Sequence, residues 1–124
     1  MIAEVDAASR DPRQQLRLLF KRVTALATRD RIELALLATA DHPTVWPVLD
    51  RVTRRRIDFA ARLFQRLGFP RAEAKRRALL AYSAYLGHTQ LVHATPQLLP
   101  KTQAARSAYL NDVLAALTSS PNPR

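Results

Sequence analysis

The chain has 124 residues, of which 48% are hydrophobic and 24% charged, a balance typical of one folded domain. It has no cysteine, which excludes a disulfide scaffold, a cysteine-containing metal site and a cysteine nucleophile. With two glycines it cannot build a glycine-rich phosphate loop. The absence of cysteine fits a reducing compartment, and we expect a cytoplasmic protein.

The formal net charge of +10 is concentrated in one part of the sequence. Residues 51–77 carry ten basic and two acidic side chains, whereas residues 1–50 carry seven of each. This basic segment would attract an anionic partner. The segment can be a solvated helix face, or a surface that binds phosphates or an acidic protein. No aromatic platform is interleaved on its exposed face and no helix-turn-helix pair is evident, which favours the solvated face without excluding the binding surface.

Helix start and stop signals predict six helices in chain order. The first, over residues 2–8, is short and reads like the end of a longer helix. Asp11 is a suitable N-cap and Pro12 a favourable first residue for the second helix, which is expected to end near residue 28. Apolar residues spaced by three and four predict one buried face of this helix. They are Leu16, Leu19, Phe20, Val23, Leu26 and Ala27.

The third helix is predicted over residues 31–40 and the fourth over residues 44–67. Thr44 is expected to cap the fourth helix, and Pro47 falls in its first turn, where no intrahelical N–H is needed. Gly68 follows as a left-handed C-terminal residue, which predicts a sharp end to the helix.

The fifth helix is expected to run from Pro70 or Arg71 to about Thr95, and the sixth over residues 103–118. The fifth is apolar nearly all round between Ala78 and Leu86, which predicts burial on two sides. A second subunit or a central position within a monomer would provide that burial. Polar residues and two prolines within residues 78–100 argue against a membrane span.

One arginine lies on the predicted apolar face of the fourth helix. Arg56 projects near the centre of the arc that contains Val52, Phe59 and Leu63. An ion pair with another helix would explain its position. So would a role in anchoring a polar or carboxylate-bearing ligand in a cavity.

The titratable residues form no evident catalytic set. His88 and His93 are five positions apart, on different faces of a helix, which makes them a poor metal pair. Glu73 is the only acidic residue between Phe59 and Asn111, so a carboxylate pair is not expected there. We therefore predict no enzymatic activity, no metal site and no cofactor.

Several stretches resemble a known family: residues 41–49 (DHPTVWPVL), 66–69 (RLGF), 72–82 (AEAKRRALLAY) and the pair Leu86-Gly87. Together with the order of helices, they resemble the C-terminal regulatory domain of TetR-family transcriptional regulators over about residues 11–118. The resemblance implies an all-α bundle of about five to six helices with a cavity for a small effector. It also implies dimerisation through the last two long helices.

The same resemblance implies that residues 1–10 are the remnant of a helix from an N-terminal helix-turn-helix domain. Residues 119–124 are expected to be a disordered tail. The expected function is effector binding and homodimerisation in a transcriptional repressor, the effector altering the affinity of the helix-turn-helix domain for operator DNA. The alternative is a free-standing basic helical protein that binds nucleic acid through residues 51–77. No membrane partner is expected.

The candidate site residues are chosen because of the helix faces on which they lie, and not because they match a motif of the family. The expected ligand pocket consists of Phe20, Trp46, Arg56, Phe59, Phe64, Tyr82, Tyr85 and His93. The expected dimer interface consists of Ala81, Ala84, His88, Leu91, Tyr109, Val113, Leu114 and Leu117.

Overall fold

The computed structural model describes residues 11–26 and 41–119. Every regular element within these ranges is a helix, so the all-α prediction is confirmed there. The elements are α2 (Pro12–Leu26), α4 (Trp46–Arg66), α5 (Arg71–Ala94), the 3-10 helix η1 (Pro96–Leu98) and α6 (Gln103–Thr118). The helices expected over residues 2–8 and 31–40, the expected linking remnant at 1–10 and the tail from residue 120 lie outside the described ranges.

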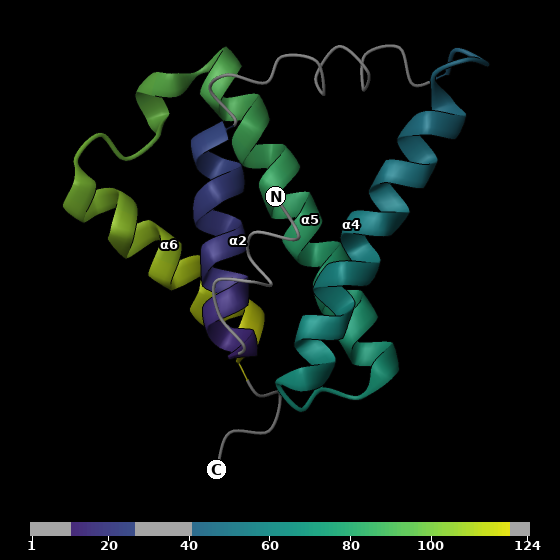
Figure 1. Ribbon diagram of the computed structural model, residues 1–124. Coiled ribbons are helices and arrows are strands. Elements are labelled where there is room, and N and C mark those ends of the chain that lie inside the picture. Colours follow the sequence, from purple (N-terminus) through teal and green to yellow (C-terminus); the bar gives the residue numbers. More distant parts are fainter. Residues whose placement is uncertain (1–10, 27–40, 120–124) are drawn as a thin grey trace.

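The helices pack with α4 and α5 as antiparallel neighbours joined by a tight turn, and this pair makes the most extensive contact in the described part of the chain. α2 contacts α4, α5 and α6. Figure 1 shows α4 close to α5 at the turn that joins them and diverging from it towards Trp46. The N-terminal half of α4 therefore stands away from both α2 and α5.

Several helix ends follow from local signals in the sequence. The side chain of Asp11 accepts a hydrogen bond from the Arg13 N–H at 3.1 Å, which confirms the predicted start of α2. Gly68 has φ 109°, a left-handed conformation that side chains oppose, and α5 begins directly after Pro70. Thr102 caps α6 by accepting from the Ala105 N–H at 3.1 Å.

The predicted cap of α4 is wrong. The helix begins at Trp46, its N-cap position is Val45, and no side chain caps it. His42 supplies the acceptors instead: its carbonyl binds the N–H groups of Val45 and Trp46 at 3.0 and 3.1 Å. The Thr44 N–H donates to His42 Nδ1 at 3.2 Å. Pro47 does lie in the first turn, as predicted.

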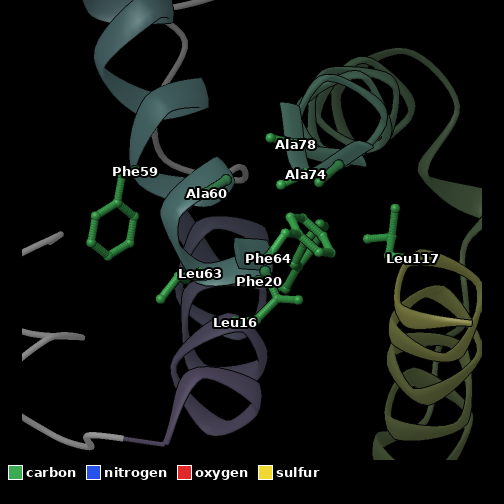
Figure 2. Packing of buried hydrophobic residues seen from close by; sticks show 10 residues of the cluster. Leu16, Phe20, Phe59, Ala60, Leu63, Phe64, Ala74, Ala78 and Leu117 are labelled. Atoms are coloured by element: carbon green, nitrogen blue, oxygen red, sulfur yellow. The ribbon is translucent and has the colours of Figure 1, made fainter. Parts of the chain in front are cut away.

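The core forms where α2, α4 and α5 meet (Figure 2). Phe64 is fully buried at its centre and meets the ring of Phe69 edge-on, with centroids 6.1 Å apart. α5 contributes small residues, which allow α4 to pack closely against it. The buried apolar residues are Leu16, Phe20, Phe59, Ala60, Leu63, Phe64, Ala74, Ala78, Ala81 and Leu117.

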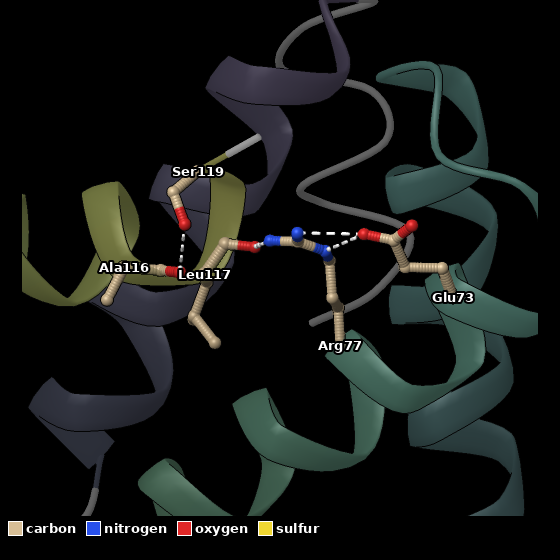
Figure 3. A network of polar contacts seen from close by, with 5 residues as sticks. All are labelled: Glu73, Arg77, Ala116, Leu117 and Ser119. Atoms are coloured by element: carbon tan, nitrogen blue, oxygen red, sulfur yellow. Dashed lines mark hydrogen bonds and ion pairs between the residues drawn. The ribbon is translucent and has the colours of Figure 1, made fainter. Parts of the chain in front are cut away.

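A polar network centred on Arg77 ties α6 to this core (Figure 3). Arg77 donates to Glu73 at 2.9 Å through Nε and pairs with the same carboxylate at 2.8 Å through Nη2. Its Nη1 donates to the Leu117 carbonyl at 2.8 Å, which satisfies a carbonyl in the last turn of α6. The guanidinium also lies over the Phe69 ring, 4.0 Å from its centroid. One side chain thus joins α5, α6 and the turn after α4.

Candidate ligand-binding site

A half-open cavity of about 80 Å³ lies between α2, α4 and α5, beside the core. Its walls are almost entirely apolar. Arg56 is the one charged side chain among the described residues that line it. The lining residues are Leu16, Leu19 and Phe20 from α2, Arg56, Phe59 and Ala60 from α4, and Ala78, Ala81, Tyr82 and Tyr85 from α5.

The spacing of these residues explains why they meet. Each helix presents positions three or four apart, which share one helical face. Ala78 and Ala81 are the positions at which α5 faces α4, and their small side chains leave space that leucine or phenylalanine would fill. Tyr82 and Tyr85 border that space, with ring centroids 5.8 Å apart.

Five of the eight residues predicted for the pocket line this cavity. They are Phe20, Arg56, Phe59, Tyr82 and Tyr85. The cavity therefore brings together one predicted residue from α2, two from α4 and two from α5.

The other three predicted pocket residues lie elsewhere. Phe64 is enclosed in the core, where its contact with Phe69 places it away from the cavity lining. Trp46 is 54% exposed, because the first turn of α4 stands away from the other helices. His93 lies near the C-terminal end of α5, two turns beyond Tyr85, and is not part of the lining.

The pocket prediction missed five lining residues. Leu16, Leu19 and Ala60 lie on apolar helix faces and Ala81 belongs to the predicted dimer interface, but neither these four nor Ala78 is in the predicted pocket. The small size of Ala78 and Ala81 is the feature of the sequence that could have predicted their place in the cavity lining. Alanines at inward positions of a long helix, opposite aromatic residues, leave room between helices.

Two residues predicted for the dimer interface are buried within the chain itself, which corrects that prediction. Ala81 faces α4 across the cavity, and Leu117 packs in the core while its carbonyl binds Arg77. Neither is available to a second subunit. Val113 and Leu114 are partly buried against the same core.

The remaining predicted interface residues lie where α5 meets α6 or face outward. The His88 ring stacks on the Tyr109 ring with centroids 6.0 Å apart and an angle of 20° between the planes. Burial lowers the pKa of His88 from its ordinary 6.5. Ala84 is half-buried, and Leu91 is exposed.

An outward stripe along α5 remains apolar. Leu80, Ala84, Gly87 and Leu91 recur at spacings of four, three and four, so they share one face. Leu80 is 56% exposed, as is its neighbour Leu79. The stripe shares Ala84 and Leu91 with the predicted interface, but Leu80 takes the place of Ala81, which turns inward, and Gly87 takes the place of His88.

The basic side chains of residues 51–77 fall into two groups, those that make contacts within the fold and those that are exposed. Arg66 donates to Gln15 at 2.6 Å and Arg77 belongs to the core network, so both serve the fold. Arg54 pairs with Asp50 at 2.9 Å, and Arg62 lies over the Phe59 ring, 5.9 Å from its centroid. The other exposed basic residues of the segment are Arg51, Arg55, Arg71, Lys75 and Arg76.

Searches for other kinds of site and for relatives gave three negative findings. Within residues 11–26 and 41–119, no group of three or more histidine, aspartate or glutamate side chains is placed to hold a metal ion. No helix in this part of the chain is long and apolar enough to cross a membrane. Comparison with protein-family models, curated proteins and solved structures found no match. Function is therefore inferred from the site itself.

Proposed function

We propose that this chain is the effector-binding and dimerisation domain of a transcriptional regulator of the TetR type. The observation that carries the proposal is the apolar cavity bounded by three helices, with Arg56 in its wall. Apolar walls with very few polar groups are the usual lining of small-molecule sites. A small effector is the partner that fits this lining.

The position of the cavity suggests how binding would be transmitted. An occupant would contact α2, α4 and α5 together, so it would favour one spacing of these helices over others. In an intact regulator of this type, a helix-turn-helix domain would precede this one. If the effector binds one spacing of the three helices more tightly than another, it would shift the equilibrium between them and so change the affinity of the helix-turn-helix domain for operator DNA.

We test this proposal with a thermal-shift screen of small molecules. A ligand that binds only the folded chain raises the melting temperature, and the rise grows with the logarithm of the ligand concentration once that exceeds Kd. Ala81→Leu places a larger side chain in the cavity and should abolish the shift, whereas Ala72→Leu, at an exposed position of the same helix, should leave it unchanged. Ligands that stabilise both variants equally would place binding elsewhere and contradict the proposal.

The proposal includes a homodimer formed through α5 and α6. Its support is the outward stripe of Leu80, Ala84, Gly87 and Leu91, in which the small residues allow a close approach of helices. Light scattering should give a mass near twice 14.0 kDa. Leu80→Glu should halve it, whereas Leu98→Glu, at an exposed residue of η1, should not. A wild-type mass of 14.0 kDa at high concentration would exclude this interface.

Nucleic-acid binding is the second candidate function. Its support is a row of exposed arginines on one face of α4, Arg51, Arg55 and Arg62, at spacings of four and seven. Titration with duplex DNA of arbitrary sequence at low salt tests it. Binding that weakens with salt and with the double variant Arg51→Met/Arg55→Met would favour this function, and no binding at low salt would exclude it.

A further inference from the structure

The lining of the cavity indicates the chemistry of the group that can occupy it. Its surface is almost entirely apolar, although Arg56, Tyr82 and Tyr85 belong to it. These three side chains have interactions of their own, and they border the space with the aromatic rings and the stem of the arginine, not with polar atoms. A polar or charged group placed there would lose its water, and the described residues would offer it very little hydrogen bonding in return.

The volume of the cavity restricts the shape of the enclosed group. About 80 Å³ is well below the 300 Å³ or more of pockets that enclose drug-sized ligands. It is also below the roughly 150 Å³ of an engineered apolar cavity that binds benzene. A six-membered ring therefore exceeds the space, whereas the end of an alkyl chain fits it. Because the cavity is half-open, the rest of such a ligand can extend to the surface.

We infer that the ligand is an uncharged molecule with a linear alkyl chain, the end of which lies between Phe20, Phe59 and Ala81. This inference rests on the proposed function, because it concerns the same cavity. The affinity comes from burial of methylene groups, each of which lowers Kd about fourfold. The cavity therefore distinguishes ligands by the length and width of the chain, and it excludes a charge.

A series of primary alcohols from 1-butanol to 1-octanol tests the role of chain length. Titration of the whole chain, followed by nuclear magnetic resonance of the Ala78 and Ala81 methyl groups, measures both affinity and entry into the cavity. We expect Kd to fall about fourfold with each added carbon that is enclosed. The fall should end within the series, because later carbons extend through the open side. An affinity that does not depend on chain length would overturn the inference.

Three further probes with six carbons test width and charge. Cyclohexanol should bind more weakly than 1-hexanol, because its ring exceeds the enclosed volume. Hexanoate and hexylammonium should each bind at least about tenfold more weakly than 1-hexanol, since a charge beside an apolar wall loses hydration without gaining a partner. This order should hold even though the net charge of +10 attracts the anion.

Leu19→Ala and Leu18→Ala form a matched pair of variants in α2. Both leucines are half-buried, but only Leu19 lines the cavity. Leu19→Ala enlarges the cavity, so the affinity for cyclohexanol relative to 1-hexanol should rise about fourfold for each ring carbon newly enclosed. Leu18→Ala should leave this ratio at the wild-type value. An equal ratio in both variants would refute the role of cavity width. If Leu19→Ala fails to fold, the order of the six-carbon probes in the wild-type chain decides the matter.

The outcomes distinguish the inference from the proposed function. Hexanoate or hexylammonium binding as tightly as 1-hexanol at the Ala78 and Ala81 methyl groups would overturn the uncharged ligand class and still support a ligand cavity. Cyclohexanol binding as tightly as 1-hexanol would do the same for the linear chain. If no probe affects these methyl groups, the inference fails, and a fragment screen that also finds no ligand there would overturn the proposed function with it.

Discussion

Replacing Arg77 by methionine should destabilise the fold more than any other single arginine replacement in α5. Methionine keeps an unbranched apolar stem against Phe69 but removes the ion pair with Glu73 and the hydrogen bond to the Leu117 carbonyl. Both partners are shielded, with Arg77 and Glu73 side chains only 14% and 21% exposed. The network is therefore screened far less than a surface ion pair.

The magnitude follows from the groups left behind. A lost hydrogen bond from a charged donor costs about 1.5–3 kcal/mol, and the cation–π contact adds about 1 kcal/mol. Because one side chain makes both contacts, the terms overlap, and we expect a total of about 3 kcal/mol. That corresponds to a fall of about 10 °C in the melting temperature of a chain of this size.

Urea denaturation followed by circular dichroism measures this effect, and Arg76→Met serves as the matched control. Arg76 is the exposed neighbour of Arg77, so its replacement should change stability by less than about 0.5 kcal/mol. Glu73→Gln combined with Arg77→Met should cost less than the sum of the two single changes. Equal effects of Arg76→Met and Arg77→Met would refute the argument that Arg77 holds α6 to the core.

Three further predictions follow from single positions. Because burial lowers the pKa of His88 below 6.5, the unfolded chain binds this proton more readily, so the free energy of unfolding should fall as the pH drops below about 6.5. His88→Phe keeps a ring against Tyr109 and should weaken that dependence, as judged by urea midpoints near pH 7.5 and 5.5; an unchanged dependence would assign it to other groups. Gly68→Ala should destabilise the fold by about 1 kcal/mol, because Gly68 has φ 109°. Gly87 lies in a helix with nothing within 4 Å of an added Cβ, so Gly87→Ala should stabilise the fold by about 0.5–1 kcal/mol. Thermal melts measure both effects, and the same sign for both would contradict this account. Phe64→Ala should cost about 3–5 kcal/mol in urea denaturation and Val48→Ala less than 1 kcal/mol, because Phe64 is fully buried and Val48 is exposed; similar costs would show that Phe64 is not central to the core.

Local chemistry made most helix ends predictable. Pro12 and Pro70 fix φ and lack an N–H, and Gly68 tolerates the left-handed φ that ends a helix, whatever the rest of the chain does. The helix boundaries beside these three residues therefore lie within one residue of their predicted positions. Thr44 is different, because its capping role competes with His42. The carbonyl and ring of His42 already satisfy the nearby N–H groups, and no sequence pattern shows which acceptor prevails.

The faces of α5 could not be assigned from periodicity. Leu80 and Ala81 are both apolar, and the helix is apolar on both sides, so hydrophobicity alone does not tell which faces α4. The packing of the helices decides which residue turns inward: Ala81 is buried beside the cavity between α4 and α5, and Leu80 is left outside. The prediction that Trp46 lines the pocket was wrong for a related reason, because an aromatic side chain is buried only where another helix packs against it.

The divergence of α4 from its neighbours gives this helix the geometry of a lever. Its C-terminal end is held by Phe64 and by the turn at Gly68, whereas Arg56 lies about 12 Å and Trp46 about 27 Å along the axis from Phe64 at 1.5 Å per residue. A rotation of a rigid α4 about that end therefore moves Trp46 roughly twice as far as it moves Arg56. The single tryptophan of the chain lies where this displacement is largest, so Trp46 is the residue of α4 at which a distance measurement would detect such a rotation most readily.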